Sequence, residues 1–537
     1  MYPRKLTRSV ISNPDYPVVE TKHGKLRGLW EEDVFIFRGV QYAKAKRFHL
    51  PEAPDSWEGT KTAIIYGPVC PEIHTPIAHD EYNVPHYHYV QDEECHYLNI
   101  WTKHIERGAK RPVMVWIHGG GFSTGSSIEL YAYDGHELAD FGDVVVVSLN
   151  HRLNCLGYLN LSSFGEQYKY TGNMGQVDLI AALHWVRENI EAFGGDPNNV
   201  TIMGQSGGGG KVDALLQTPA SAGLYHRAVI QSGLFEGSRD LLPEGSKLLG
   251  ETVIEILGFT DCPEKIETVP YYKLARAVQQ AQEQLVGKVD GPMGMLCPTK
   301  DDEFYFGSGQ CNPFVPANKN VPLLVGSVLG EFDQNYNNVY APGSKNEWSE
   351  EMVSELVREV YGEHVDAVVT AHQKAYPGAK TADCLFINRG GRVAARNYAM
   401  KRKAEGCAPA YNWLFNLECP LNSGTIPWHN AEEAYMFHNA NYLEASYIPG
   451  VSEQLQDEMT GAWVAFAESG NPNHVGMPIW HETTLDNGAC MIFDRVTREE
   501  YHHDDELMVA IPIKDVFPKN HKRKPGSRIG GGPRQSL

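Results

Sequence analysis

Val200-Thr201-Ile202-Met203-Gly204-Gln205-Ser206-Gly207-Gly208 is the stretch of sequence that decides the fold of this chain. Its first four residues have the composition of a buried strand, and the glycines after them favour a sharp turn into a helix. Ser206 lies at the apex of that turn, where strand and helix come too close together for side chains on both sides of the serine. The stretch therefore predicts a nucleophile elbow, with the serine hydroxyl lifted into reach of a substrate.

A second glycine loop lies upstream, where Trp116-Ile117-His118-Gly119-Gly120-Gly121-Phe122 ends an apolar run over residues 113–117. Free backbone amides in such a loop can hold a developing oxyanion. A plain flexible loop is the alternative interpretation. Two separate parts of one acyl-transfer site are thus indicated by the sequence.

Short segments rich in Val and Ile recur along the chain and are separated by helix-length segments. This alternation of strand and helix segments is typical of an α/β fold with a mostly parallel buried sheet. Leu179, Leu183 and Val186 follow a helical spacing just before the elbow, and further helices are predicted over residues 352–361 and 457–468. The predicted strands are residues 113–117, 144–149, 200–203, 228–231, 323–325 and 408–415.

The composition and net charge of the chain exclude some classes of function. The 537 residues carry a formal net charge of −20, which would repel nucleic acid or an anionic membrane surface. No apolar stretch is long enough to span a bilayer, and no secretory signal is visible at the start, so a cytoplasmic location is expected. We expect a single domain over residues 1–520 and a disordered basic, glycine-rich tail over 521–537, although two domains remain possible.

The cysteines and histidines give little sign of a metal or redox site. The 10 cysteines include no C-x-x-C pair, so most are expected to be buried thiols. A metal site in the Pro-interrupted loop between Cys70 and Cys95 is disfavoured, because scattered histidines there have no enforced ligand geometry. Those histidines are His74, His79, His86 and His88. No cofactor is expected.

Taken together, these motifs resemble the type-B carboxylesterase and cholinesterase-like family of α/β-hydrolases. The elbow fits the serine signature of that family, and Glu93-Glu94-Cys95-His96-Tyr97-Leu98-Asn99-Ile100 resembles its second signature. Glu94 and His96 stand where the family usually has Asp and Leu. The resemblance covers nearly the whole chain, and it implies a mostly parallel central sheet flanked by helices, with large helical and loop insertions over the active site.

A serine hydroxyl needs a base to take its proton, and the base needs a third group to orient it. In α/β-hydrolases the chain order is serine, acid, histidine. Glu331 follows the apolar segment Leu323-Leu324-Val325 and resembles the acid of the G-x-x-x-D-E-G stretch of the family, although Gly330 and Phe332 depart from it. Asp333 is the fallback acid, and an exposed loop carboxylate is the other alternative.

The predicted base is His429. It opens the stretch His429-Asn430-Ala431-Glu432-Glu433-Ala434-Tyr435-Met436-Phe437, which resembles the H-x-x-E-L-x-x-x-F loop of the family with Glu433 in place of Leu. Among 22 histidines, this one combines the right chain order, a loop after a strand and the flanking pattern.

The same resemblance implies further roles. The backbone amides of Gly120, Gly121 and Gly207 would form the oxyanion hole. Glu93 and Arg152 would form a salt bridge that supports the loops. Cys70 and Cys95 would match the first disulfide loop of the family, a bond that a reducing cytoplasm would disfavour.

Two departures bear on the substrate. Gln205 replaces the usual Glu before the nucleophile, which removes a negative charge near a cationic leaving group. Gly207 replaces a common Ala, and its missing β-carbon is expected to loosen the elbow. The Cys70 to Cys95 loop also lacks the tryptophan that cholinesterases use for their cationic substrate, and its tyrosines are weaker substitutes. Those tyrosines are Tyr82, Tyr87 and Tyr89.

These features predict a serine carboxylic-ester hydrolase that works through an acyl-enzyme. Ser206 would attack, His429 would move the proton, and Glu331 would orient the histidine. The expected partner is a small, neutral ester, and the sequence leaves the oligomeric state open. The alternative is a cholinesterase-like adhesion or scaffold protein, and the complete triad argues against it.

Overall fold

The computed structural model describes residues 9–73, 89–289, 296–332, 340–341 and 343–513. Several predictions concern residues outside these ranges. They are the metal alternative at residues 74–88, the fallback acid Asp333, the side chains of Tyr82 and Tyr87, and the tail over 521–537.

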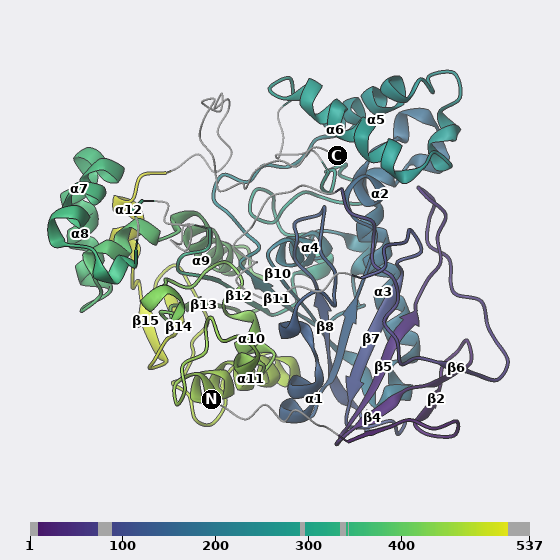
Figure 1. Ribbon diagram of the computed structural model, residues 1–537, viewed down its shortest axis with the longest axis horizontal. Coiled ribbons are helices and arrows are strands. Elements are labelled where there is room, and N and C mark those ends of the chain that lie inside the picture. Colours follow the sequence, from purple (N-terminus) through teal and green to yellow (C-terminus); the bar gives the residue numbers. More distant parts are fainter. Residues whose placement is uncertain (1–8, 74–88, 290–295, 333–339, 342, 514–537) are drawn as a thin grey trace.

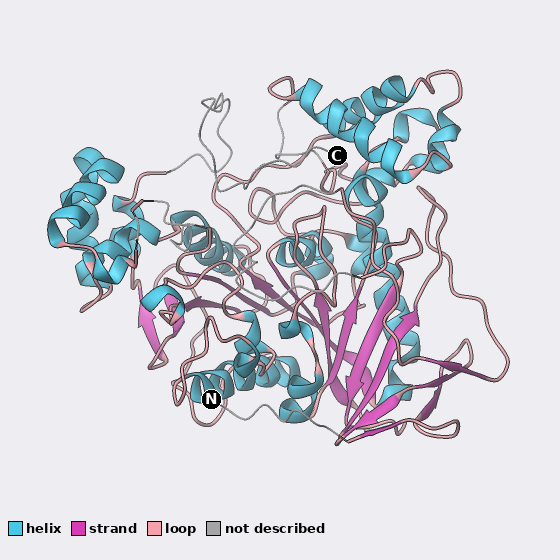
Figure 2. Ribbon diagram, in the orientation of Figure 1, coloured by secondary structure: helices cyan, strands magenta, loops and turns pink. Residues whose placement is uncertain are grey.

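A twelve-stranded sheet forms the centre of the described chain (Figures 1 and 2). Neighbouring strands run parallel from β9 through β8, β10, β11, β12 and β13 to β14, and antiparallel at both edges. The predicted large, mostly parallel sheet is confirmed. In spatial order the strands are β1 (Val10–Ile11), β4 (Leu29–Glu31), β5 (Val34–Gln41), β7 (Tyr97–Thr102), β9 (Val145–Leu149), β8 (Arg111–Ile117), β10 (Gly195–Gln205), β11 (Arg227–Gln231), β12 (Leu323–Val328), β13 (Ala410–Phe415), β14 (Ala489–Phe493) and β15 (Arg498–Tyr501).

Helices cover both faces of this sheet, and the alternation of side chains along the strands explains why. In β8, Val113 and Val115 point into one apolar cluster, while Met114 and Trp116 point into another on the opposite face. The first cluster is completed by α3 (Met174–Asn189), α4 (Gly207–Leu216) and α9 (Arg389–Ala404). The second is completed by α1 (His136–Gly142), α10 (Glu433–Met436) and α11 (Ser452–Ser469).

Two helical insertions have apolar clusters of their own and lie apart in Figure 1. One contains α2 (Asn154–Tyr158), α5 (Pro243–Leu257) and α6 (Tyr271–Leu285). The other contains α7 (Glu350–Tyr361), α8 (Val365–Ala375) and α12 (Asp505–Ala510). The helices predicted over 352–361 and 457–468 are confirmed within α7 and α11. A small separate sheet pairs β2 (Val18–Glu20), β3 (Lys25–Arg27) and β6 (Thr60–Thr62).

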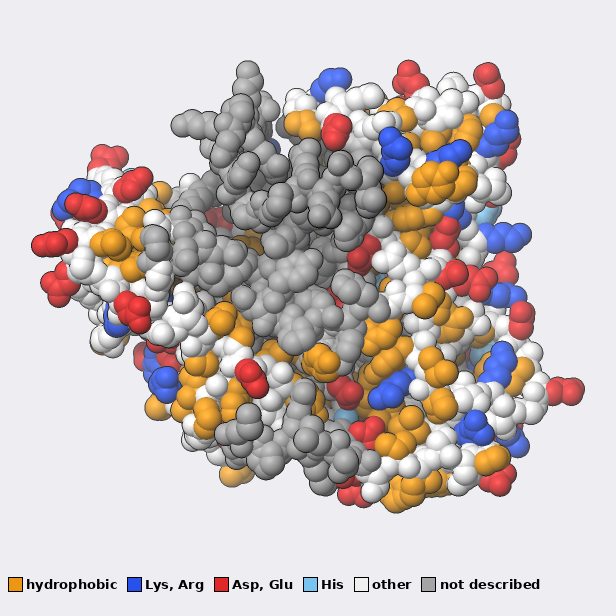
Figure 3. Space-filling view, viewed as in Figure 1, with side chains coloured by type: hydrophobic (Ala, Val, Ile, Leu, Met, Phe, Trp, Pro, Cys, Tyr) orange, Lys and Arg blue, Asp and Glu red, His pale blue; other side chains and the backbone are white. Residues whose placement is uncertain are grey.

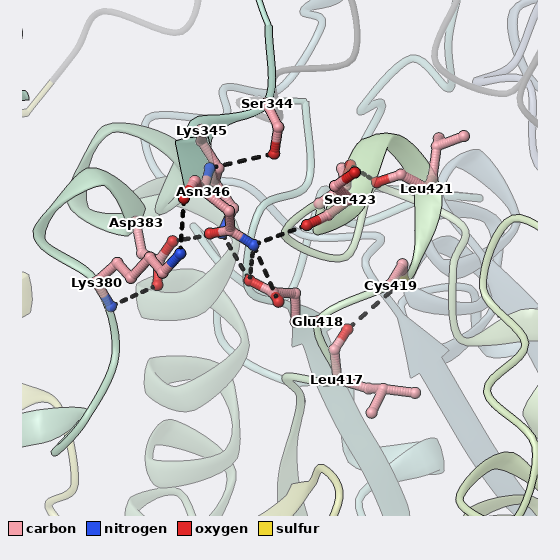
Figure 4. A network of polar contacts seen from close by, with 11 residues as sticks. Ser344, Lys345, Asn346, Lys380, Asp383, Leu417, Glu418, Cys419, Leu421 and Ser423 are labelled. Carbon is pink, nitrogen blue, oxygen red and sulfur yellow. Dashed lines mark hydrogen bonds and ion pairs between the residues drawn. The ribbon is translucent and has the colours of Figure 1, made fainter. Parts of the chain in front are cut away.

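A buried lysine anchors the α7–α8 insertion to the sheet (Figure 4). Lys345 Nζ donates to Asp383 Oδ1 and to Glu418 Oε2, each at 2.6 Å, and its side chain is 2% exposed. Asp383 precedes α9, and Glu418 follows β13. Breaking this network would leave an uncompensated charge in the interior. It therefore holds the segment before α7 next to the residues that precede α9 and follow β13.

On the face shown in Figure 3, acidic and basic side chains are interspersed over the described elements. No helix in the described ranges combines the length and the apolar composition needed to cross a bilayer.

Candidate active site

The predicted strand, turn and helix around Ser206 are confirmed. β10 ends at Gln205, α4 begins at Gly207, and Ser206 between them has φ 56° and ψ −127°. A non-glycine residue in this region is strained, and the sheet and helix around it hold the strain. A β-carbon at Gly208 would lie 2.0 Å from the Ile117 carbonyl oxygen, so helix and sheet approach as closely as the sequence predicted.

The structure brings Ser206, His429 and Glu331 together. His429 Nε2 lies 2.7 Å from Ser206 Oγ, and His429 Nδ1 hydrogen-bonds to Glu331 Oε2. Both His429 and Glu331 are fully buried. Because the carboxylate accepts from Nδ1, the proton of the neutral ring is held there, and Nε2 is left to accept from the serine hydroxyl.

Strand ends position the acid and the histidine. Glu331 follows β12, and its second oxygen accepts from the Val328 amide at 3.1 Å. His429 follows β13, and the backbone of Glu331 pairs with that of Trp428. The two loops are therefore held side by side at the end of the parallel strands where the elbow also lies.

A second buried carboxyl group, that of Glu432, lies near this group. The sequence analysis did not predict it as part of the site. Gln231 Nε2 donates to Glu432 Oε1 at 3.3 Å, and Oε2 has no partner within the described residues. Burial and the negative charge of Glu331 raise the pKa of Glu432 to about 8. At neutral pH Glu432 is therefore mostly protonated. The acidic position of the H-x-x-E pattern was the signal that could have pointed to it.

Three backbone amides face no acceptor near the elbow. In the ranges that the structure covers, the N–H groups of Gly120, Gly121 and Gly207 donate no hydrogen bond. Gly207 is the first residue of α4, where helix amides lack intrahelical partners. A β-carbon built on Gly119 would lie 3.3 Å from the Ser206 β-carbon, so the glycine loop reaches the serine itself.

The expectation that Gly207 loosens the elbow is wrong. A β-carbon at Gly207 would lie 2.1 Å from the carbonyl oxygen of Gly121 and 2.3 Å from its α-carbon. The backbone of the glycine loop thus fills the space that an alanine methyl would need. In this chain the missing β-carbon permits a close approach between loop and helix.

Gln205 makes a hydrogen bond that a glutamate at the same position could not make. Its side chain is buried, and Nε2 donates to the backbone carbonyl of His429. An ionised glutamate has no proton to donate there. Gln205 therefore helps to hold the histidine loop against the elbow.

The expected Glu93–Arg152 salt bridge is wrong. Arg152 pairs with Asp178, with Nη2 2.6 Å from Oδ1, whereas Glu93 pairs with Arg47, with Nε 2.8 Å from Oε2. Asp178 lies on α3 and is fully buried, so it needs the charge of Arg152 close by, and it also lies 3.1 Å from Nε2 of His96. Glu93 is partly exposed, and its charge is matched by Arg47.

Cys70 and Cys95 are free thiols in the structure, and both are buried. Cys70 Sγ accepts from the Leu153 amide at 3.2 Å, and hydrogen bonding with Cys70, together with burial, raises the pKa of Cys95 well above its usual value. The disulfide that the resemblance implied is therefore not formed here. Across the described ranges, no group of three or more acidic, histidine or cysteine side chains is arranged to hold a metal ion.

Two phenylalanine rings flank the histidine. The Phe332 ring centroid lies 3.9 Å from that of His429, and Phe235 lies 6.0 Å from His429 and 5.8 Å from Phe332. Phe332 is 52% exposed, so the ring presents an apolar face beside the site. In the sequence it was visible as a departure from the family's usual glycine.

A serine elbow, a histidine and a buried carboxylate at one end of a mostly parallel sheet define an α/β-hydrolase. The chain belongs to the carboxylesterase family, because residues 15–507 match the model described as "Carboxylesterase family". It is therefore an esterase that acts on carboxylic ester bonds.

Similar proteins are esterases as well. The chain is 32% identical over 515 residues to para-nitrobenzyl esterase of Bacillus subtilis strain 168, covering 93% of this chain and 99% of that one. It is 42% identical over 504 residues to carboxylesterase 3B of Mus musculus, covering 86% and 84%. A solved structure described as "An esterase from anaerobic Clostridium hathewayi can hydrolyze aliphatic aromatic polyesters" matches with a TM-score of 0.88 and 42% identity, covering 94% of this chain and 99% of that one.

Proposed function

We propose that this carboxylesterase hydrolyses neutral esters through an acyl-enzyme formed on Ser206. Ser206 Oγ attacks the ester carbonyl while His429 Nε2 takes its proton, and Glu331 stabilises the imidazolium that forms. The observation that carries the proposal is the position of the His429 ring, whose two nitrogens contact Ser206 Oγ and Glu331 Oε2.

The remaining steps follow from the same groups. The amides of Gly120, Gly121 and Gly207 stabilise the oxyanion of the tetrahedral intermediate. His429 then gives its proton to the departing alcohol, leaving the acyl group on Ser206. A water molecule attacks the acyl carbonyl while His429 takes a proton from it, and the second intermediate collapses to release the carboxylic acid. Every atom of this cycle comes from the ester, water and these residues, so no cofactor is required.

Labelling with a fluorophosphonate tests the proposed nucleophile. The reagent should modify Ser206 and inactivate the enzyme in parallel, because its phosphorus is attacked by the same activated hydroxyl. Peptide mapping by mass spectrometry locates the adduct. Ser232 is a built-in control, since it is also a serine with a positive φ after a strand, but its buried hydroxyl has no partner among the described residues. An adduct on Ser232, or turnover without an adduct on Ser206, would contradict the proposal.

Three features near the site support neutral substrates. Gln205 carries no charge, Glu432 is mostly protonated at neutral pH, and the carboxylate of Glu331 is engaged by His429. The exposed face of Phe332 favours an apolar or aromatic group on the ester. The described action of the Clostridium hathewayi esterase on aliphatic aromatic polyesters agrees with an aromatic ester as substrate.

A choline ester and its uncharged isostere test this preference. We expect kcat/KM for 3,3-dimethylbutyl butyrate to exceed that for butyrylcholine by about tenfold or more, because the two alcohols share a shape and the quaternary ammonium would lose hydration without gaining a carboxylate. Gln205→Glu should narrow this ratio, even if the lost hydrogen bond slows both reactions. A preference of the wild type for butyrylcholine would show that acidic or aromatic side chains elsewhere form a cation site.

A further inference from the structure

Lys211 is a fully buried lysine in α4, five residues beyond Ser206. Its Nζ donates to the carbonyl of His118 at 2.9 Å and to that of Gly119 at 3.4 Å. Within the described part of the chain, this ammonium forms no ion pair, and Glu129 acts on it only as a nearby charge. A buried lysine without an ion pair is uncommon, because burying a charge is costly unless the charge is matched. The ammonium is instead directed at the backbone of the glycine loop.

The acceptor at Gly119 matters because of the peptide to which it belongs. The carbonyl of Gly119 and the N–H of Gly120 are the two ends of one peptide group, and His118 Nδ1 also contacts that carbonyl at 3.0 Å. Hydrogen bonds accepted by a carbonyl polarise the peptide and make its N–H a stronger donor. A positive charge on the Gly119 side therefore strengthens the Gly120 amide on the substrate side.

Several titratable groups face Lys211. His118 and His151 lie beyond the ends of β8 and β9 with ring centroids 5.1 Å apart, and burial and the charge of Lys211 lower the pKa of both. Both imidazoles are therefore neutral near pH 7. Burial lowers the pKa of Lys211 to about 7, and the negative charge of Glu129 opposes that shift. The charge at this position thus depends on pH in the neutral range.

We propose that Lys211 is a positioning residue of the oxyanion hole, whose ammonium fixes and polarises the Gly119–Gly120 peptide so that the Gly120 amide stabilises the oxyanion more strongly. The proposal rests on the acyl-enzyme mechanism proposed above. Lys211 does not contact the substrate, and its effect passes through the peptide group.

The proposal fixes the sign of a pH effect. The charged amine is the form that supports catalysis, so its contribution is present below the pKa of about 7 and is lost as the pH rises through it. The wild type should therefore show a kcat that declines on the alkaline side, and a variant without the amine should lack that decline.

Lys211→Met tests the proposal, and Lys401→Met is the matched control. Lys401 Nζ also donates to two backbone carbonyls, those of Gly309 at 2.7 Å and Asn312 at 2.6 Å, but neither belongs to the glycine loop. With a p-nitrophenyl ester below neutral pH, Lys211→Met should lower kcat by about tenfold, leave KM within about twofold and abolish the alkaline decline. Lys401→Met should leave kcat and its pH profile unchanged.

An aryl trifluoromethyl ketone supplies a readout of the oxyanion itself. Its hemiketal with Ser206 places an oxyanion in the hole, so its affinity should fall in Lys211→Met by about the same factor as kcat/KM. The affinity of the wild type should also weaken as the pH rises above neutral. The pH dependence of ketone affinity is measured on the wild type, so it tests the proposal independently of how the variant folds.

The lowered pKa of Lys211 also predicts how Lys211→Met changes the stability of the fold. The folded state binds the Lys211 proton more weakly than the unfolded chain does, so this lysine lowers the free energy of unfolding below its folded pKa, and the penalty shrinks as the pH rises above it. Lys211→Met removes that penalty and should melt no lower than the wild type at acidic pH.

The proposal is overturned if Lys211→Met keeps the wild-type kcat, ketone affinity and pH profile, or if Lys401→Met changes them equally. A failure of the proposed function would look different. In that case the wild type itself would show no adduct on Ser206 or no ester turnover.

Discussion

Ser206→Ala is expected to lower kcat by at least about a thousandfold without changing the melting temperature. The serine hydroxyl forms the covalent bond in the proposed cycle, and a methyl group has no nucleophilic oxygen. His429→Ala and Glu331→Gln should each cost on the order of a thousandfold or more, because the base and its orienting carboxylate act through the same step. Steady-state kinetics with a p-nitrophenyl ester and thermal unfolding measure both quantities.

Double variants sharpen this prediction. Combining Ser206→Ala with Glu331→Gln should cost little more than Ser206→Ala alone, since the three residues act as a unit. Glu432→Gln is the matched control for the acid, because Glu432 is already mostly neutral at neutral pH, and it should retain most of the activity. The acid assignment is wrong if Glu331→Gln keeps nearly full activity while Asp333→Asn loses it.

The sheet could be predicted where its strands are buried on both faces. β9 consists of Val145–Leu149 with every residue buried, and this run, which is apolar except for Ser148, is visible in the sequence. The antiparallel edges carry a weaker signal. β15, Arg498–Tyr501, contains no buried residue, and β7, Tyr97–Thr102, includes polar positions whose burial depends on neighbouring strands. β7 pairs with β5 and β9, which are far away in the sequence, whereas β15 forms by folding back on its neighbour β14.

The three residues proposed to react could be located from the sequence because glycine spacing and chain order constrain them. The contacts of Ser206, His429 and Glu331 agree with that order. Buried charges outside the motifs could not be predicted in the same way. Nothing in the sequence around Lys211 shows that its amine is directed at the Gly119 carbonyl, since a lysine in a helix is usually exposed. Arg152 was assigned the wrong partner for a similar reason, because sequence gives the charge of a residue but not its distance to another.

Gly207→Ala is expected to lower kcat by about a hundredfold, although alanine is common at this position in the family. The added methyl carbon would lie 2.1 Å from the Gly121 carbonyl oxygen, much closer than atoms can approach. The start of α4 cannot move away, because Gly208 packs against the Ile117 carbonyl. The glycine loop must therefore shift and carry the Gly121 amide away from the oxyanion, and loss of one such donor costs about a hundredfold to a thousandfold in kcat.

Gly210→Ala separates this effect from a general response of α4 to alanine. A β-carbon at Gly210 would lie 3.4 Å from the Phe122 ring, which is an ordinary contact, and alanine is a better helix former than glycine. That variant should keep its kcat and melt slightly higher, whereas Gly207→Ala should lose kcat and trifluoromethyl ketone affinity together. If Gly207→Ala keeps both, the Gly121 amide does not depend on the close approach of loop and helix, and the oxyanion hole needs only Gly120 and residue 207. If ketone affinity falls with kcat, the space left by the missing methyl group is part of how this chain builds its oxyanion hole.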